Sequence, residues 1–115
     1  MLSLRRGNVV FAPFPHEDER DVFDKRPCLV LAVDNENNRF LAAKITTTEL
    51  RQYWSFRLSP GTGDTASGRI LKESWINLNR REWIPVKDCL RVFAMLNSEV
   101  MNAILARMDI LKIEI

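Results

Sequence analysis

Two short apolar segments separated by a turn constrain the fold of this chain more than any other part of its sequence. Residues 27–33 read PCLVLAV, residues 40–46 read FLAAKIT, and the polar stretch DNENNR lies between them. Asn and Asp tolerate the left-handed backbone of a tight turn, and their side chains hydrogen-bond to it. Apolar runs of this length, bounded by turn residues, are typical of buried strands. The sequence therefore predicts an antiparallel pair of strands joined by this turn.

Further segments carry strand patterns. They are residues 7–15 (GNVVFAPFP), 54–58 (WSFRL), 74–78 (SWINL) and 82–86 (EWIPV). In WSFRL the apolar residues alternate, as expected of a half-buried strand. Polar loops are expected at 16–25 (HEDERDVFDK) and 59–68 (SPGTGDTASG). Residues 87–96 fit either a strand or a short helix, and both alternatives stay open.

The apolar period changes near the C-terminus. Asn97 is a suitable N-cap, and Glu99 lies in the first turn, where the helix dipole favours a negative charge. Apolar residues then recur at three- and four-residue spacing, at Val100, Met101, Ile104, Leu105 and Met108. This pattern predicts an amphipathic C-terminal helix of about three turns.

Together these elements predict a mainly β protein of the α+β class. At 115 residues and 13.4 kDa the chain has the size of one domain, which would span residues 1–115. Several short strands and one helix indicate a small, strongly curved antiparallel barrel with the helix packed on it. The longest apolar runs are too short to cross a bilayer and the N-terminus lacks an apolar signal segment, so we expect a cytoplasmic protein without a membrane partner.

The Cys and His content argues against a metal site. Cys28 and Cys89 have aliphatic neighbours, as core thiols do, and a single histidine excludes the usual zinc constellations, so we expect no metal or cofactor. The net charge of +2 does not by itself indicate a nucleic-acid partner. However, residues 17–24 carry five acids and one base, which leaves 16 basic and 10 acidic residues elsewhere. That distribution suggests an anionic partner, although solvated surface charge is the commoner explanation.

Arg26 and a run of threonines stand at the ends of the two central strands. An arginine fork matches phosphate oxygens two at a time, and a threonine hydroxyl can donate to another oxygen of the same group. Because the two strands are expected to be neighbours, Arg26 and Thr46 could converge on one anion. Side chains alternate along a strand, so Thr46 and Thr48 would share a face that Thr47 does not. The alternative is that ITTT is simply β-favourable composition and Arg26 a solvated flank.

Three segments together resemble a known protein family. RRGNVVFAPFP (5–15), KRPCLVLA (25–32) and NRFLAAKITTT (38–48) are similar to the PemK/MazF-like toxins of bacterial toxin–antitoxin pairs, which carry an RGD-strand, an RP-x-L-V strand and an [AP]-x-I-T segment in this order. The resemblance is weaker through LKESWINLNRREWIPV and the terminal helix. It implies an SH3-like barrel of the CcdB/PemK-like type, a homodimer, and a cognate antitoxin as partner.

The resemblance also implies an activity and a site. The activity is metal-independent endoribonuclease cleavage of single-stranded mRNA, by attack of the 2′-hydroxyl on the adjacent phosphate to give a 2′,3′-cyclic phosphate. The family's RP arginine falls on Arg26 and its I-T threonine on Thr46, the predicted catalytic pair. His16 is the one side chain with a suitable ordinary pKa for a general base. Thr47 and Thr48 are further catalytic candidates.

Binding of RNA would need additional contacts. Candidates for its phosphates are Lys25, Lys44, Arg51, Arg57, Arg69 and Lys72. Candidates for stacking on unpaired bases are Phe23, Tyr53, Trp54 and Trp83, for which core packing is the alternative.

The chain also departs from the family pattern. Asn8 replaces the acid common after the opening glycine, and the first loop is acidic where RNA would approach. Two alternatives to a nuclease therefore stay open. One is a non-enzymatic toxin on the same barrel, such as a topoisomerase poison of the CcdB-like kind. The other is an inactive relative that binds RNA or protein without cutting. Only the nuclease needs Arg26 and Thr46 together.

Overall fold

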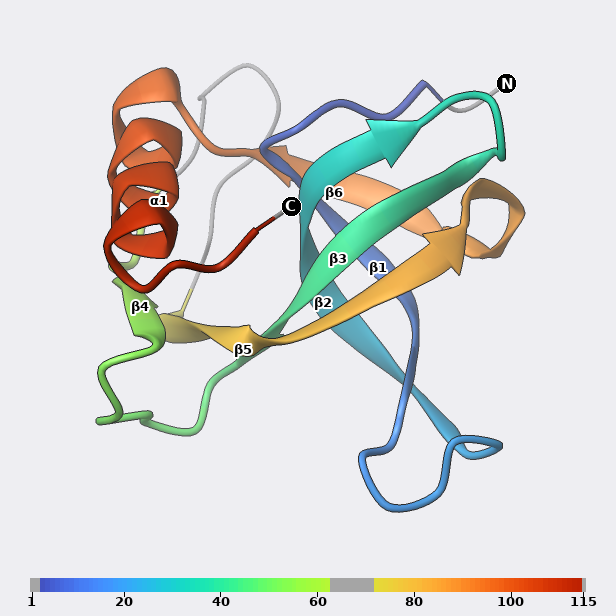
Figure 1. Ribbon diagram of the computed structural model, residues 1–115, viewed down its shortest axis with the longest axis horizontal. Helices are drawn as coiled ribbons and strands as arrows, with labels where there is room; N and C mark the ends of the chain where they lie inside the picture. The colour runs from blue at the N-terminus through green and yellow to red at the C-terminus, as the bar shows by residue number, and fades with distance from the viewer. Residues whose placement is uncertain (1–2, 63–71, 115) are drawn as a thin grey trace.

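The computed structural model describes residues 3–62 and 72–114 (Figure 1). Its elements are β1 (Asn8–Pro15), β2 (Phe23–Asp34), β3 (Arg39–Thr46), β4 (Ser55–Leu58), β5 (Ser74–Pro85), η1 (Val86–Asp88), β6 (Arg91–Met95) and α1 (Ser98–Ile110). The strands form one six-stranded antiparallel sheet in the order β4-β5-β3-β2-β1-β6. The prediction of a mainly β fold with one C-terminal helix is confirmed.

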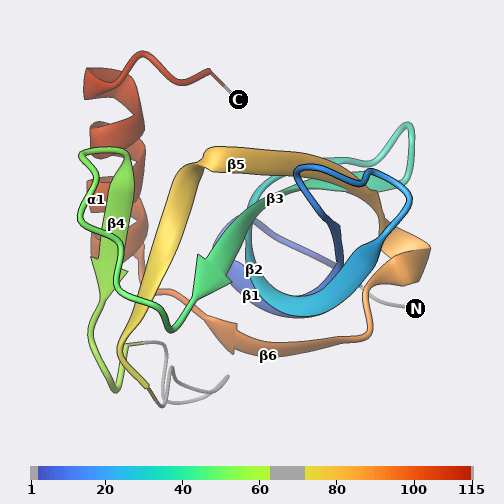
Figure 2. The same ribbon diagram turned by 90° about the horizontal axis from the view of Figure 1, so that it is seen from below.

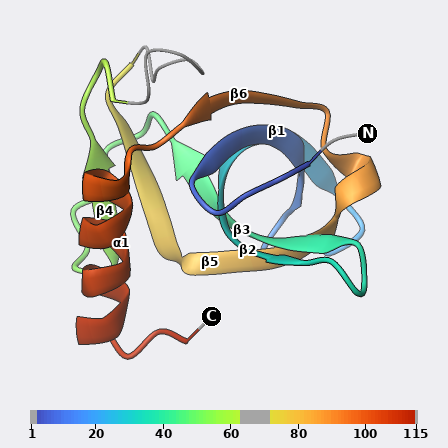
Figure 3. The same cartoon turned by 90° about the horizontal axis from the view of Figure 1, so that it is seen from above.

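The sheet is curved into a barrel. Figure 2 and Figure 3 show β1, β2, β3, β5 and β6 arranged around a ring, with α1 and β4 on one side of it. Neighbouring residues of one strand alternate between two apolar clusters, as the pleat requires. Val10, Ala12, Phe14, Cys28, Val30, Phe40 and Ala42 belong to the cluster enclosed by the ring. Val9, Leu29, Ile45, Ile76 and Leu78 belong to the cluster that packs against Met101, Ile104 and Met108 of α1.

The central hairpin forms as predicted, but β2 is longer than expected. It begins at Phe23, not at Pro27, because residues 23–26 pair with the end of β1 and Ala12 lies opposite Arg26. The loop between β1 and β2 is correspondingly shorter, at 16–22. Pro27 has no N–H with which to extend a ladder. The ladder between β2 and β3 ends at the adjacent pair Cys28–Lys44.

The prediction of two separate strands at 74–78 and 82–86 is wrong. The structure has one strand, β5, with an irregularity in the middle: one step along β3, from Ala43 to Lys44, corresponds to four steps along β5, from Arg81 to Asn77. Such bulges bend a strand and redirect its side chains. The bend in β5 is visible in Figure 2. Arg80 lies on the bulged segment, between Asn77 and Arg81.

Residues 87–96 were expected to form either a strand or a short helix, and the structure has a short helical turn followed by a strand. A single 3-10 turn, η1, precedes β6. The predicted helix cap is confirmed, because the Asn97 side chain accepts a hydrogen bond from the backbone N–H of Val100 at 2.9 Å. Within residues 3–62 and 72–114, no helix is long and apolar enough to span a membrane.

Candidate functional site

A small polar pocket opens where the β1–β2 hairpin meets β3 and β5. Its volume is about 250 Å³, and its lining residues are Phe14, Pro15, His16, Glu17, Asp18, Asp24, Arg26, Lys44 and Arg80. Three of these are cations that come from three different strands, namely Arg26, Lys44 and Arg80. A convergence of fixed positive groups in a hollow is an arrangement suited to an anion such as phosphate.

Strand register brings Arg26 and Lys44 to the pocket. Cys28 is paired with Lys44 across the β2–β3 ladder, so these two side chains share a face. Arg26 lies two residues before Cys28 on β2 and therefore points to the same side. The sequence placed Arg26 correctly on the strand beside the threonine segment. It did not predict that Lys44 would line the same pocket as Arg26.

Arg80 is the functional candidate that sequence reasoning missed. It is 9% exposed, and its guanidinium lies over the Phe14 ring at 5.0 Å from the centroid. Nη2 donates to the carbonyl of Pro15, and Nη1 donates to Oε1 of Glu82 at 2.5 Å. The buried Nε has no hydrogen-bond partner among the described residues, although Oε1 of Glu17 lies 3.4 Å away. Arg80 lies between the two segments that were expected to be separate strands, at the bulge that joins them into β5.

Glu82 holds Arg80 in place from the far side of the pocket. Arg20 donates to both carboxylate oxygens of Glu82, at 2.5 and 2.8 Å. The hydrogen bond from Arg20, followed by that from Arg80, lowers the pKa of Glu82 below its ordinary value, against the opposing effect of burial. Glu82 is therefore ionised at neutral pH and balances part of the charge of these two arginines.

Besides His16, the charged residues that line the pocket are three cations and the three carboxylates Glu17, Asp18 and Asp24. Burial, and after it the nearby charge of Arg26, lowers the pKa of Lys44 below its ordinary value. Arg80 acts in the same direction, while Glu17 and Asp24 oppose it. A bound anion would relieve the repulsion among these cations.

Carboxylates of the β1–β2 hairpin reach over the same cations. Oδ2 of Asp24 lies 2.8 Å from Nε2 of His16 and 3.9 Å from Nη2 of Arg26. His16, the candidate general base, therefore lines the same pocket as Arg26. The segment that is acidic in sequence is thus the segment that covers the cationic site.

The structure places Thr46 at the end of β3, and Thr47 and Thr48 lie beyond that strand. Thr46 is the last residue of β3, is half-buried, and pairs with Trp75 of β5. Its Oγ1 accepts the backbone N–H of Thr48 at 3.1 Å, so the hydroxyl proton is free to donate elsewhere. Thr46 is on the Lys44 face, two residues further along β3, and is not among the residues that line the pocket. Thr47 and Thr48 are exposed beyond the strand.

Most of the other predicted RNA contacts lie away from the pocket. Lys25 is exposed and pairs with Pro13, on the face opposite to Arg26. Arg51 is paired with Glu49 and Arg57 with Glu73. Lys72 is exposed. Arg69 lies outside the described residues.

Of the aromatic candidates, two come together and two do not. Phe23 and Trp83 line one hollow of about 440 Å³ on the other side of the β1–β2 hairpin, and they are 55% and 40% exposed. The guanidinium of Arg39 covers Trp83 at 4.3 Å from the ring centroid. Tyr53 and Trp54 precede β4 and lie near α1, where Arg107 donates to the carbonyl of Tyr53.

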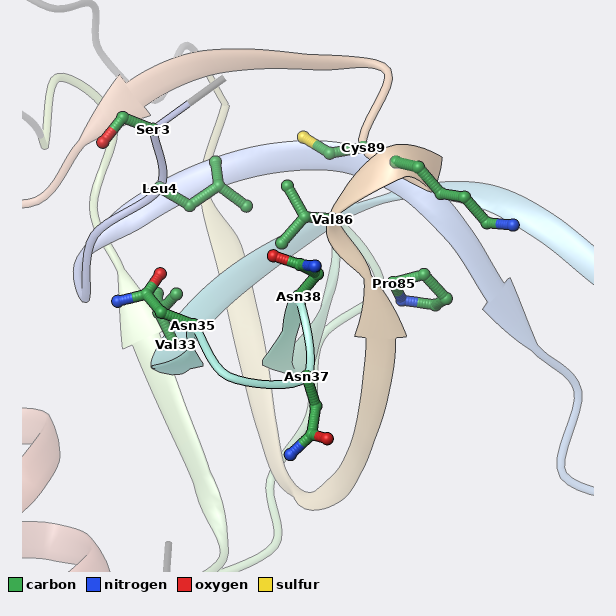
Figure 4. Close-up of a pocket in the computed structure, with 10 residues that line it drawn as sticks. Ser3, Leu4, Val33, Asn35, Asn37, Asn38, Pro85, Val86 and Cys89 are labelled. Atoms are coloured by element: carbon green, nitrogen blue, oxygen red, sulfur yellow. The ribbon is translucent and has the colours of Figure 1, made fainter. Parts of the chain in front are cut away.

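A larger hollow opens at another end of the barrel. It measures about 790 Å³ and lies between the N-terminal segment, the β2–β3 turn and η1 (Figure 4). Leu4, Val33, Val86 and Cys89 line its apolar wall, and the asparagines of the turn line its rim. None of the predicted catalytic residues reaches it. Among the described residues there is no group of three or more His, Cys, Asp or Glu that could hold a metal ion.

The fold and the site together define a small antiparallel β-barrel protein with a C-terminal helix and a polar pocket on which cations from three strands converge. The chain belongs to the family of PemK-like, MazF-like toxins of type II toxin–antitoxin systems, whose family model matches residues 5–111. The resemblance seen in the N-terminal segments is thereby confirmed. No curated protein matches the chain.

Solved structures share the fold at low sequence identity. One is described as an endoribonuclease in complex with its cognate antitoxin from a mycobacterial species; it is 16% identical with a TM-score of 0.70, and the match covers 98% of this chain and 99% of that one. The Mycobacterium tuberculosis toxin MazF-mt6 is 19% identical with a TM-score of 0.66, over 94% and 99% of the two chains. A MazE–MazF structure from Deinococcus radiodurans is 13% identical with a TM-score of 0.65, over 99% and 100%.

Proposed function

We propose that this protein is an endoribonuclease toxin that cleaves single-stranded mRNA without a metal ion. The 2′-hydroxyl of one nucleotide attacks the adjacent phosphorus, and the products are a 2′,3′-cyclic phosphate and a free 5′-hydroxyl. The observation that carries this proposal is the convergence of Arg26, Lys44 and Arg80 on one pocket of about 250 Å³. Membership of the toxin family supports it, as do the descriptions of similar folds as endoribonucleases.

The three cations would stabilise the charge that develops during the reaction. As phosphorus becomes five-coordinate, negative charge builds on its non-bridging oxygens, and fixed donors aimed at them lower the barrier. Arg26 is the main donor in this scheme because it is half-buried but still partly exposed, at 35% of its side chain. Arg80 contributes a guanidinium charge whose position is fixed by Glu82 and Pro15. Lys44 adds a point charge, and Thr46 orients the phosphate from the end of β3.

The general base in this scheme is His16. An imidazole is the side chain most often used to take a proton such as that of the 2′-hydroxyl. The side chain lines the pocket and is 43% exposed, so substrate can reach it.

Membership of the toxin family implies two partners, an antitoxin and a second copy of this chain. A cognate antitoxin would silence the toxin by covering the pocket, in line with the antitoxin complexes of proteins with similar folds. The active form would be a homodimer in the cytoplasm.

The test is cleavage of RNA by purified protein. We expect fragments with 2′,3′-cyclic phosphate and 5′-hydroxyl ends, at a rate that EDTA does not change. Arg26→Ala should lose at least about 10²-fold in rate, the typical cost of removing one transition-state donor, while its circular dichroism stays that of the wild type. Arg51→Ala is the matched control, because Arg51 is exposed and remote from the pocket.

The alternative is a non-enzymatic toxin on the same barrel. It predicts growth arrest that persists in Arg26→Ala and RNA that stays intact with the wild-type protein. Either result would overturn the nuclease proposal.

A further inference from the structure

Asp24 stands between the two groups that the proposed reaction uses. A single oxygen, Oδ2, lies 2.8 Å from Nε2 of His16 and 3.9 Å from Nη2 of Arg26. We propose that Asp24 is a positioning residue that fixes the tautomer and orientation of His16 and, through the same oxygen, holds Arg26 beside it. This inference rests on the proposed function, because it assigns a role within the same site.

Local structure holds this carboxylate in place. Asp24 belongs to β2 and pairs with Phe14 of β1, so its backbone is part of the hairpin ladder. His16 follows directly after β1, and its backbone N–H donates to the carbonyl of Val22 at 2.8 Å. That bond closes the loop and brings the imidazole across to the carboxylate. The contact between the two side chains therefore rests on backbone structure at both ends.

The contact determines which ring nitrogen is the base. An ionised carboxylate only accepts hydrogen bonds, so the nitrogen 2.8 Å from it carries the proton. In the neutral imidazole the other nitrogen, Nδ1, then has the lone pair. Nδ1 takes the proton of the 2′-hydroxyl while the O2′–P bond forms and the P–O5′ bond breaks. The departing 5′ oxygen takes its proton from solvent, and the imidazolium later returns its proton to solvent.

Asp24 also lies beside the imidazolium that this step creates, with Oδ2 2.8 Å from Nε2. The longer distance to Arg26 leaves that guanidinium with donors for the phosphate. The other charged groups that line the pocket around His16 are Glu17, Asp18, Lys44 and Arg80. Among the described residues, Asp24 is the one carboxylate that lies within 4.0 Å of a ring nitrogen of His16.

A double-mutant cycle tests whether Asp24 acts through His16. Removing a general base costs about 10²–10⁴-fold in rate. We expect Asp24→Asn to lose at least about tenfold in kcat while RNA affinity holds or improves, because a negative charge is removed. In the His16→Ala background the same change should cost clearly less in kcat than in the wild type, because only the contact with Arg26 is then lost. Asp24→Glu should restore part of the rate. Glu19→Gln is the control, since it removes an acid of the same loop that does not line the pocket.

A second measurement does not depend on cleavage. His16 is the sole histidine of the chain, so the nitrogen resonances of one imidazole report its tautomer directly. We expect the Nε2-protonated form in the wild type at neutral pH and a mixture of tautomers in Asp24→Asn.

The outcomes separate this inference from the proposed function. Full additivity of the two substitutions, or an unchanged tautomer in Asp24→Asn, would overturn the role of Asp24 while RNA cleavage by the wild type still stood. Wild-type protein that leaves RNA intact would overturn both proposals.

Discussion

Nη1 of Arg80 donates to Oε1 of Glu82 at 2.5 Å, two residues along the same strand, while the Nε of Arg80 is buried without a hydrogen-bond partner among the described residues. The bulge in β5 brings Arg80 to the pocket, while Glu82 lines the neighbouring hollow. Both terminal nitrogens of the guanidinium are therefore anchored by protein, and the carboxylate of Glu17 lies 3.4 Å from the buried Nε. The site is preorganised before any substrate arrives.

Replacing Arg80 should damage both stability and RNA binding. Arg80→Met leaves the Glu82 carboxylate and the Pro15 carbonyl without this partner, which costs about 1–3 kcal/mol in the free energy of unfolding. Urea denaturation and filter binding of a short RNA measure the two effects. Arg80→Lys keeps the positive charge but lacks the planar guanidinium. Weaker RNA binding in this variant as well would support a role for the geometry of the guanidinium. RNA affinity equal to wild type in both variants would exclude Arg80 from the site.

The side chains of Thr46 and Thr47 are expected to point in opposite directions, and this alternation makes a separate prediction. Thr46→Val removes the hydroxyl from the face of Lys44 and should reduce kcat by about 10²-fold, as the loss of one donor to the transition state does. Thr47→Val changes an exposed residue beyond the strand and should leave kcat near wild type. Thr46→Ser restores the hydroxyl and should recover activity. Equal losses in Thr46→Val and Thr47→Val would contradict this assignment.

The acidic segment should weaken RNA binding, because Oε1 of Glu17 lies 3.4 Å from the buried Nε of Arg80. Glu17→Gln removes that carboxylate, so we expect tighter binding of RNA and a lower KM. The comparison should be made at several salt concentrations, since exposed charges are screened as ionic strength rises. Binding that stays the same or weakens would mean that Glu17 assists the substrate.

Glu82 should contribute to the stability of the fold in a pH-dependent way. Its pKa is lowered in the folded state, first by the hydrogen bond from Arg20, so the folded protein favours the ionised form. The resulting stabilisation is present above the ordinary pKa of glutamate and is lost as the pH falls through the lowered value. Glu82→Gln should therefore be less stable than wild type near neutral pH, with a difference that shrinks on acidification. A difference independent of pH in urea denaturation would contradict this.

Gly7 is a position where the backbone requires glycine. Its φ is +98°, and an added Cβ would lie 3.0 Å from Sδ of Met95 and 3.3 Å from Cγ of Met101. Gly7→Ala should lower the free energy of unfolding by about 1–2 kcal/mol from backbone conformation alone, with the methionine contacts adding to it. Gly61→Ala is a control for backbone strain without contact, because Gly61 has φ +85° and open space around it. Thermal unfolding of the two variants separates these effects.

Local patterns in the sequence were sufficient to predict most of the strands and the helix. The Asn and Asp turn between β2 and β3 forms where expected, with Asn38 at φ 50°. The cap at Asn97 and the apolar spacing after it define α1. These features depend on residues close together in the chain, where propensity, capping and periodicity act directly.

Other features depend on partners far away in the chain. The extension of β2 to Phe23 required pairing with Pro15, and the merging of two expected strands into β5 required β3 as a template with a bulge. Arg80 reads as a surface charge in the sequence, but the bulge buries it. The partners of His16 and Arg26 also came from folding, which set Asp24 between them.

The sequence alone determined the central hairpin, the C-terminal helix and its cap, the resemblance to a toxin family, and the choice of Arg26 and Thr46 as candidates. Only the tertiary structure determined which charges meet. The physical reason is that a side chain's direction along a strand depends on register and bulges, and these are set by pairing between segments distant in sequence.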